Sequence, residues 1–556
     1  MNAKKLLALL LALVMCVGVL AGCDQKPAET TAPPTTTAPA GTTAPATTAV
    51  PTETTEAAPL KNSDIYPLDC DYTFKIATGR PDPAATVNWG LFLDTVGINY
   101  EWQITATEQT QLMFLDEKSM PDIFWYVSGI SNTQVQDYGA AGLLVNFKDY
   151  LELMPNLRAA IEKYPNLLDL VADDDGNFYQ LPGYKYELAG ASAFFYVRTD
   201  HTKAAGWEEL PTTVEDFLVM CEDLKQHFAD VEGYYPMLQN NASNLKYNNT
   251  MSQFMFPAFG ELMQPGIGTN DDFTKIEAGF ATEQFKRYLI FMNTMYEKGY
   301  LDPDCFNAVS SETKAKTNEG LTTMHPHATQ LKPENFPSGN MDFQAMPSMT
   351  SQYQSEARWP MLDTIKSWFI MINANCPEIE TAVQALDACF APIDNRLNEE
   401  GTVWAESLWL GELGIDFDYD DEANTYEILP HEGFDSASAW LAVAGTGNTP
   451  FMEWPYYENT GTGLQVKCES FLEIQMPVAV DVFYTSHLTL TEDERDIYTD
   501  AWVDIDKYLT EMNAAFITGQ MDIEAEWETY LKELDVRGLQ DVIDIYQAAL
   551  DRYNAR

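Results

Sequence analysis

The chain has 556 residues, of which 46% are hydrophobic and 21% charged, so it can bury a large core and form several domains. Its 84 Asp and Glu residues against 32 Lys and Arg residues give a formal net charge of −52. A surface this acidic repels phosphate backbones and anionic lipid headgroups. We therefore expect no nucleic-acid partner and no direct adsorption to a membrane.

The N-terminus is typical of a bacterial lipoprotein signal peptide. Two lysines precede an apolar run from Leu6 to Ala21, which is shorter than a membrane-spanning helix requires. The segment Leu20–Cys23 resembles the lipobox, in which a lipid is attached to the cysteine sulfur before cleavage in front of the cysteine. We predict a signal peptide over residues 1–22 and a lipid on Cys23. The alternative is an ordinary secretion signal.

Residues 23–60 read as the lipidated cysteine followed by a tether. Asp24–Pro59 contains 12 Thr, 9 Ala and 7 Pro among its 36 residues. Such a composition cannot bury a core, and its prolines favour an extended polyproline conformation. We expect this linker to hold the body of the protein away from the membrane, so that the lipid alone provides contact with the bilayer.

The remaining cysteines are scattered and contain no CxxC pair, which excludes a disulfide scaffold and a zinc ribbon. Cys376 and Cys389 could pair, but we expect buried free thiols for most of the six. These cysteines are Cys70, Cys221, Cys305, Cys376, Cys389 and Cys468.

The body begins with alternating strand and helix patterns. Asp71–Ala77 alternates apolar and polar residues, and Gly97–Trp102 and the apolar Asp122–Tyr126 also read as strands. A helical stretch follows at Leu144–Leu153. This alternation predicts an α/β sheet.

Later segments carry helix signals. Thr212 and Thr213 open a helix that extends to about Phe228, and Phe285–Tyr296 is amphipathic and followed by Gly299. Thr491 with Glu494 forms a capping box before a long apolar stripe. Two more helices are predicted near the C-terminus, at Ile523–Leu534 and Gln540–Tyr553.

A series of short motifs in a fixed order carries a family resemblance. The motifs are Pro121–Trp125, Tyr138–Leu144, Asp175–Pro182, Val197–Asp200, Pro211–Thr213, Leu289–Pro303, Ile372–Glu378, Phe516–Gly519 and Tyr546–Tyr553. Together they resemble the extracellular solute-binding proteins of ABC importers, in the large family that includes the maltodextrin-binding protein. The C-terminal motifs resemble a lipoprotein subgroup that binds oligosaccharides or aldouronates. Asn177 and Gln180 depart from the family's usual Lys and Gly.

The resemblance implies a type II periplasmic-binding-protein fold, with two α/β lobes joined by hinge crossings and a helical C-terminal portion. We expect the first lobe to comprise residues 61–190 and about 368–410, and the second to comprise 191–367 and about 411–556. The expected function is that of a lipid-anchored monomeric receptor on the outer face of the cytoplasmic membrane. It would bind a carbohydrate by lobe closure, without catalysis, and deliver it to membrane permease subunits.

Aromatic side chains are the strongest indication of a ligand site, since their flat faces suit sugar rings. Trp125 lies at the carboxyl end of the third strand, where the family places a ligand-stacking Trp. The other candidates lie after strands, on the expected crossings or in an aromatic loop, and core or hinge packing is the alternative for each. The candidates are Arg80, Trp89, Trp125, Tyr126, Tyr184, Tyr186, Glu187, His325, Trp368 and Trp454.

Signatures of catalysis and of metal binding are weak. No P-loop, HExxH or GxSxG motif is present, and we expect neither a metal nor a cofactor. The acidic residues Asp416, Asp418, Asp420 and Glu427 imitate a calcium loop, but Asp421 stands where that loop needs Gly, so a solvated hairpin is the preferred interpretation. Two alternative functions stay open. They are a tethered glycan hydrolase, which would need a carboxylate pair, and a receptor for a peptide or another solute.

Overall fold

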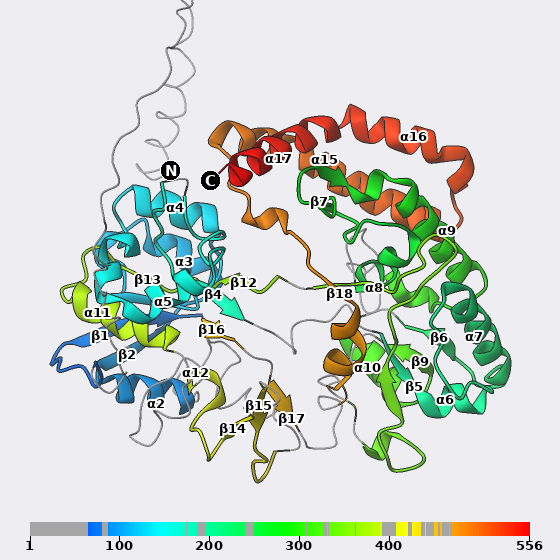
Figure 1. Cartoon of the computed structure of the whole chain (residues 1–556), viewed down its shortest axis with the longest axis horizontal. Coiled ribbons are helices and arrows are strands. Elements are labelled where there is room, and N and C mark those ends of the chain that lie inside the picture. Colours follow the sequence, from blue (N-terminus) through cyan, green and yellow to red (C-terminus); the bar gives the residue numbers. More distant parts are fainter. Residues whose placement is uncertain are drawn as a thin grey trace, which may run out of the picture. The chain divides into compact units, whose positions relative to one another are not determined.

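A computed structural model of the chain is shown in Figure 1. It describes residues 65–79, 87–173, 175–185, 195–238, 250–306, 309–325, 331, 333–361, 363–391, 407–420, 425–434, 440, 450–453, 456–458, 466 and 469–555. These residues belong to one compact unit, Leu60–Arg556. The predicted lipidation site, the linker and four candidate site residues lie outside the described residues. These four are Arg80, Tyr186, Glu187 and Trp454.

The first sheet contains the three strands predicted near the N-terminus, with ends that differ by one or two residues. Its order is β13-β3-β1-β2, and β1 pairs in parallel with both β2 and β3. The short β13 is antiparallel to β3. The strands are β1 (Thr73–Thr78), β2 (Asn99–Ile104), β3 (Ile123–Trp125) and β13 (Met371–Ile372).

Five helices pack with this sheet. They are α2 (Val87–Val96), α3 (Thr107–Met113), α4 (Asn132–Ala140), α5 (Pro155–Lys163) and α11 (Ile379–Asp387). α2, α5 and α11 contribute to the larger hydrophobic cluster, the first core, and α3 and α4 contribute to a smaller one. The helical stretch expected from Leu144 begins at Phe147 and is a 3₁₀ helix, η4 (Phe147–Leu153). It cannot merge with α5, because Pro155 disfavours the helical conformation of Met154, whose φ and ψ are −123° and 66°.

A second sheet has the order β10-β5-β9-β6 and combines parallel and antiparallel pairs. Its strands are β5 (Tyr196–Arg198), β6 (Tyr235–Met237), β9 (Thr322–His325) and β10 (Phe343–Ala345). It packs with α6 (Thr199–Ala204), α7 (Val214–His227), α9 (Glu283–Glu297) and α10 (Ser310–Asn318). Thr213 caps α7 by accepting the Asp216 amide at 3.1 Å, which confirms the predicted start of this helix.

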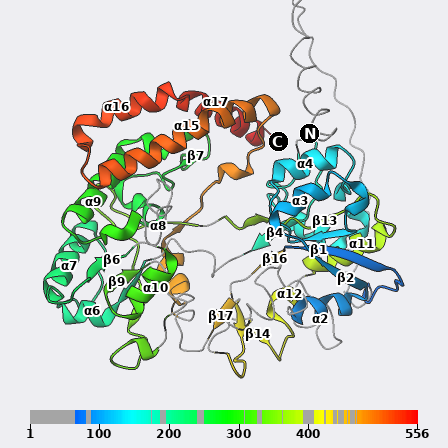
Figure 2. The same cartoon turned by 180° about the vertical axis from the view of Figure 1, so that it is seen from behind.

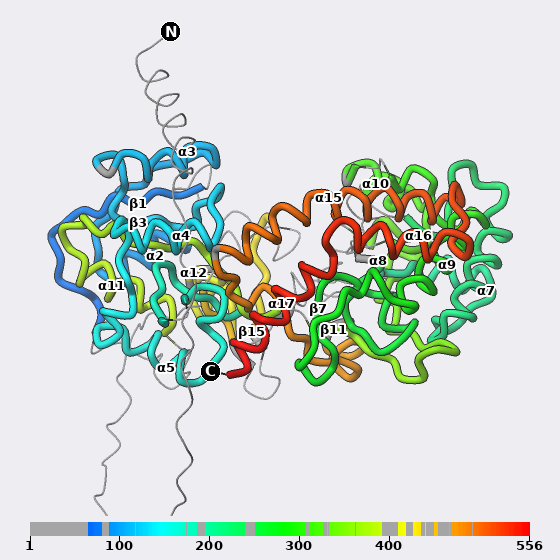
Figure 3. The backbone as a smooth tube through the Cα atoms, turned by 90° about the horizontal axis from the view of Figure 1, so that it is seen from above, coloured from blue at the N-terminus to red at the C-terminus, as the bar shows by residue number. Residues whose placement is uncertain are grey.

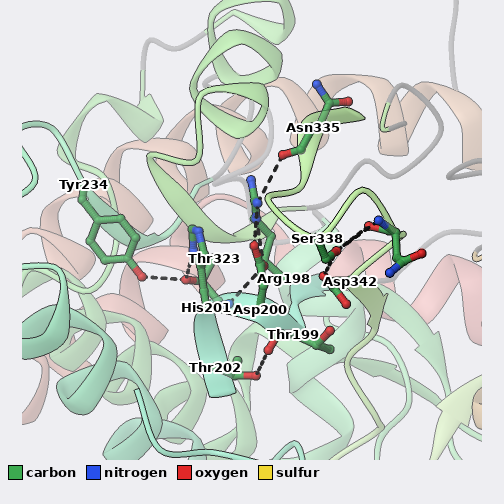
Figure 4. A network of polar contacts seen from close by, with 11 residues as sticks. Arg198, Thr199, Asp200, His201, Thr202, Tyr234, Thr323, Asn335, Ser338 and Asp342 are labelled. Carbon is green, nitrogen blue, oxygen red and sulfur yellow. Dashed lines mark hydrogen bonds and ion pairs between the residues drawn. The ribbon is translucent and has the colours of Figure 1, made fainter. Parts of the chain in front are cut away.

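Polar contacts at the start of α6 connect this helix to β5, to β9 and to Tyr234, the residue before β6 (Figure 4). The buried Arg198 guanidinium donates to Asp200 at 2.7 and 3.2 Å. His201 Nδ1 lies 3.0 Å from Thr323 Oγ1, and the Tyr234 hydroxyl lies 2.6 Å from the same oxygen. Burial, together with the positive charge of Arg198, lowers the pKa of His201 to about 4.

The C-terminal helices complete the second core. They are α15 (Glu492–Ile517), α16 (Ile523–Val536) and α17 (Leu539–Asn554), and all three lie near the positions predicted. Thr491 and Glu494 form the predicted capping box, with bonds of 2.8 and 3.3 Å. α15 and α16 pack against α9, and Figures 1, 2 and 3 show these helices close together.

The other strands of the described residues form four smaller sheets. These are β12-β4-β16, β14-β15-β17, the pair β11-β18 and the pair β7-β8. Their strands are β4 (Pro182–Lys185), β7 (Ile267–Thr269), β8 (Ile276–Ala278), β11 (Trp359–Pro360), β12 (Ile365–Ser367), β14 (Phe417–Asp420), β15 (Thr425–Ile428), β16 (Phe451–Met452), β17 (Tyr456–Glu458) and β18 (Ala479–Val480). Phe451 of β16 packs into the first core, so the chain returns to that core after β14 and β15.

The five cysteines in the described part of the chain are unpaired, and four of them are buried. They include Cys376 and Cys389, so the expectation of free buried thiols holds for these residues. No helix in the described ranges is both long and apolar enough to cross a membrane.

Candidate functional site

A pocket of about 430 Å³ lies at the carboxyl ends of β1 and β3, where an open α/β sheet places its ligand. Gly79 follows β1 directly, and the segment 126–130 follows β3. The opposite wall comes from the end of β12, with Ser367, Trp368 and Phe369. Segments far apart in the sequence therefore meet here because β3 pairs with β13, and β13 follows β12 closely in the chain.

Two candidate residues, Tyr126 and Trp368, form the aromatic part of this pocket. Their ring centroids lie 5.6 Å apart with an interplanar angle of 85°. Trp368 is half-buried, whereas 8% of the Tyr126 surface is exposed. The angle corresponds to an edge-to-face contact between the two rings.

Trp89 and Trp125 lie beneath these residues, in the first core, and neither has any exposed surface. Trp89 stacks on Tyr126 with centroids 5.5 Å apart, and its ring is 5.9 Å from that of Trp125. The structure therefore places Trp125 in the core, the alternative considered for it, and not at an exposed surface. The physical reason lies in the backbone. Trp125 ends β3 and packs against Trp89 and Trp102, whereas Tyr126 follows the strand with a φ of 54°, and its ring lies over Trp89 at the edge of the pocket.

Trp368 is held in place by close packing against β4. A Cβ atom built on Gly183 would lie 2.0 Å from Trp368 Nε1, so only a glycine allows the indole to lie there. Lys185 Nζ lies 5.7 Å from the centroid of the Trp368 ring and adds a cation–π contact. Gly183 and Lys185 both belong to β4, which pairs with β12 in antiparallel register.

The backbone is unusual at two lining residues. Tyr126 and Phe369 have φ values of 54° and 50°, in the left-handed region that residues other than glycine rarely adopt. Such a conformation costs on the order of 1–3 kcal/mol and persists where the surroundings enforce it, often at binding sites. Here the loop after β3 is fixed by two hydrogen bonds to α3. Thr107 Oγ1 lies 2.9 Å from Ser128 Oγ, and Gln111 Nε2 donates to the Gly129 carbonyl at 2.6 Å.

The lining residues that the structure describes are uncharged. None of these nine residues is acidic or basic, although the chain carries 84 Asp and Glu residues. Ser128 and Ser367 supply hydroxyl groups, and Tyr126, Trp368 and Phe369 supply aromatic surface. Hydroxyl groups beside aromatic surface suit a molecule with polar and apolar faces.

Tyr184 lies next to this pocket but does not line it. Its ring stacks on Tyr164 with centroids 4.0 Å apart, and the Tyr164 hydroxyl donates to Glu453 at 2.7 Å. Burial and the neighbouring Glu453 carboxylate raise the pKa of Tyr164 well above its usual range. The face of Tyr184 is thus covered, which favours the packing interpretation of this residue.

His325 is fully buried in β9, opposite Tyr196 of β5, and does not line the pocket. This position agrees with a core histidine, which was the alternative to a ligand contact.

The acidic segment forms the expected hairpin of β14 and β15, with Asp418 opposite Glu427. Asp416 is bound by His431 Nε2 at 2.9 Å and by the Glu412 amide at 2.8 Å. The described ranges contain no group of three metal-ligating side chains.

Several residues of the site could not be found from the sequence. Phe369, Ser128 and Gly79 carry no motif, and the role of Gly183 depends on a contact with a residue 185 positions away. The only sequence signal for Gly79 and Ser128 is their position just after predicted strands, where loops often carry binding groups.

No family model matches the chain. It is 22% identical over 480 residues to the fructooligosaccharide ABC transporter substrate-binding protein FusA of Streptococcus pneumoniae, covering 83% of this chain and 85% of the relative. The structure of FusA in complex with kestose matches with a TM-score of 0.64 and 19% identity, over 87% of this chain and 100% of that one. A solute-binding protein of Bifidobacterium longum infantis that binds HMO matches with a TM-score of 0.67 and 14% identity, over 87% and 99%.

Proposed function

Because this chain has the fold of the extracellular substrate-binding proteins of ABC importers, we propose that it binds an oligosaccharide and passes it to a membrane permease. The similarity to FusA agrees with the resemblance to solute-binding proteins that the sequence motifs indicated, and with the α/β fold expected for them. The proteins of similar fold include carriers described as binding kestose and HMO. Transport of a carbohydrate is the function that these relatives and the pocket support together.

The observation that carries the proposal is the uncharged aromatic pocket between Tyr126 and Trp368. A sugar ring has an apolar face of C–H groups and an edge of hydroxyl groups. The Trp368 indole can pack on the first, while Ser128 and Ser367 can hydrogen-bond the second. Trp368 thus replaces Trp125 as the residue that we expect to stack on the ligand.

The pocket favours binding over catalysis. Glycoside hydrolysis requires a pair of carboxyl groups on either side of the scissile bond. None of the nine lining residues that the structure describes carries a carboxyl group. None of these nine could pair with the charged termini of a peptide either, which favours a sugar over a peptide as the ligand.

We further propose that Cys23 carries the lipid anchor and that residues 24–59 act as the tether. The support comes from the sequence, in which Leu20–Cys23 matches the lipobox and the following residues are rich in Thr and Pro. The protein would then work as a monomer on the outer face of the cytoplasmic membrane. Contact with the bilayer would be made by the lipid alone, and the folded body would meet the permease.

The direct test is a thermal-shift and calorimetry screen with kestose, neutral milk oligosaccharides, alginate oligosaccharides and short peptides. A ligand present at about 100 times its dissociation constant stabilises the folded state by about 2.7 kcal/mol. We expect a neutral oligosaccharide to bind with one site per chain and to remain uncleaved. Binding of peptides alone, or release of smaller sugars from the oligosaccharide, would contradict the proposal. Trp368→Ala, which should bind weakly, serves as the control for the site.

A further inference from the structure

A second pocket, of about 260 Å³, lies among the elements of the second core and shares no residue with the first. Its walls come from α15, α17, the start of β7 and the segment that leads from β18 into α15. The region around β7, α15 and α17 can be followed in Figures 1 and 3. None of the sequence motifs predicts a site at this position.

Three aromatic side chains form one wall of this pocket. Tyr498 and Trp502 lie four residues apart on α15 and therefore share a face of the helix. Their rings are stacked with centroids 5.3 Å apart and an interplanar angle of 18°. Tyr546 of α17 meets Tyr498 edge-on, with centroids 5.7 Å apart and an angle of 88°. All three side chains are only partly buried, so ring surface faces the pocket.

The rest of the lining contains apolar residues and a set of hydrogen-bonded polar side chains. The Tyr484 hydroxyl donates to the Met361 carbonyl at 2.8 Å, and Gln264 hydrogen-bonds the same hydroxyl. Thr485 Oγ1 donates to the Ile267 carbonyl at 3.4 Å. These contacts connect the segment before α15 to β7 and to the end of β11. This polar part of the lining is preorganised, because its side chains are already fixed before any ligand arrives.

The pocket combines aromatic faces, amides and hydroxyls. Its twelve described lining residues include Gln253, Gln264, Thr485 and Ser486, and none of the twelve is acidic or basic. Like the first pocket, it therefore presents aromatic surface and hydroxyl groups, and it adds two amide side chains. Its volume of about 260 Å³ lies below the ~300–1,000 Å³ of pockets for larger ligands, so it suits a single ring.

We propose that this pocket is a second carbohydrate site, which binds one neutral sugar ring independently of the first pocket. The inference rests on the proposed function, since it takes the ligand to be of the same class. The Tyr546 and Trp502 rings would contact the C–H face of the sugar. The amides of Gln253 and Gln264 and the hydroxyl of Ser486 would bond its hydroxyls. None of the twelve described lining residues is a cation that could compensate an anionic sugar, so the proposal is for a neutral ring.

The experiment uses the full chain labelled with 5-fluorotryptophan, in which Trp368 reports the first pocket and Trp502 the second. Their fluorine resonances among the 12 tryptophans are assigned with Trp368→Phe and Trp502→Phe. D-glucose, D-galactose and D-fructose are titrated separately, followed by the oligosaccharide that binds best in the screen above. We expect at least one monosaccharide to shift the Trp502 resonance with a saturable dependence. We also expect this shift to remain in Trp368→Ala.

Ser486→Phe provides the decisive variant, since Ser486 is exposed and a phenyl ring there would fill the pocket. It should abolish the Trp502 shift and leave the Trp368 response to the oligosaccharide intact. Thr510→Phe, at an exposed position farther along α15, is the matched control and should change neither. If Ser486→Phe fails to fold, Gln253→Leu keeps the size of the side chain and should weaken the monosaccharide at least tenfold.

The outcomes separate the two proposals. A Trp368 response without any Trp502 response would overturn the second site and leave the proposed function in place. A Trp502 shift that persists in folded Ser486→Phe, or that Gln253→Leu leaves at its original affinity, would also overturn the second site. If neither tryptophan responds to any sugar, both proposals fail.

Discussion

The indole of Trp368 lies directly over Gly183, and a Cβ atom on Gly183 would stand 2.0 Å from Trp368 Nε1. The residue that we expect to stack on the ligand is thus positioned by a strand from a distant part of the chain. β4 carries Gly183, and β12 ends just before Trp368.

Gly183→Ala should displace the Trp368 indole, because the added methyl group would overlap Nε1. We expect oligosaccharide affinity to fall by about 1–3 kcal/mol, taking the stacking of a base on an aromatic ring as a guide. Calorimetry measures this loss. Gly90→Ala is the matched control: its Cβ would lie 3.2 Å from the Tyr100 hydroxyl, and it should bind like the parent protein. Equal affinities for Gly183→Ala and the parent would remove Trp368 from the site.

Trp368→Ala and Trp125→Ala should have opposite effects on binding and stability. Trp125 has no exposed surface, so truncating it should cost about 3–5 kcal/mol of unfolding free energy. Trp368 is half-buried and lines the pocket, so its loss should mainly weaken the ligand. Denaturant unfolding and calorimetry on both variants separate these effects. A large affinity loss in a fully stable Trp125→Ala would instead restore Trp125 as a ligand contact.

Asp387→Ala should destabilise the first core. The buried Asp387 carboxylate accepts the Leu157 amide at 2.8 Å and the Asn156 side-chain amide at 2.9 Å. Its removal leaves buried donors at the start of α5 without an acceptor, which costs about 1–3 kcal/mol. Chemical denaturation checks this value. Glu380→Ala, at an exposed position on α11, should change stability by less than about 0.5 kcal/mol.

The stability of the protein should fall as the pH decreases from about 6.5 to about 4, in part because of His201. Burial and Arg198 lower the pKa of His201 to about 4, whereas the unfolded chain takes up this proton near pH 6.5. The unfolded state therefore binds more protons across this window and gains stability relative to the native state. His201→Gln should be less sensitive to acid between pH 7 and 5, by at most about 2 kcal/mol. Parallel pH profiles for the two proteins would refute this assignment.

Cys23→Ser should release the protein from membranes. The prediction follows from the lipobox at Leu20–Cys23, since a serine hydroxyl cannot form the thioether. Detergent phase partitioning and mass spectrometry of the N-terminus test it. Cys70→Ser is the control, because Cys70 is a free thiol in the folded body and its loss should leave partitioning unchanged. A Cys23→Ser protein that still partitions into detergent would show that the anchor lies elsewhere.

Local features of the sequence determined the first three strands and several of the longer helices. The alternation in Asp71–Ala77 corresponds to β1, in which Phe74 and Ile76 are buried. Thr213 and Thr491 cap their helices through bonds to amides three residues away. Such patterns are readable because the interacting groups are neighbours in the chain. The order of the motifs likewise identified the fold class before any tertiary contact was known.

The tertiary structure alone decided which aromatic residues reach the pocket. Residues 123–126 are all apolar, so the sequence does not indicate which side chain of Trp125 and Tyr126 faces outward. That choice depends on the pairing of β3 with β1 and β13, which buries Trp125 against Trp89. The position of Trp368 depends on Gly183, 185 residues earlier in the chain. Contacts over such separations arise from packing between elements, which leaves no periodic signal in either segment.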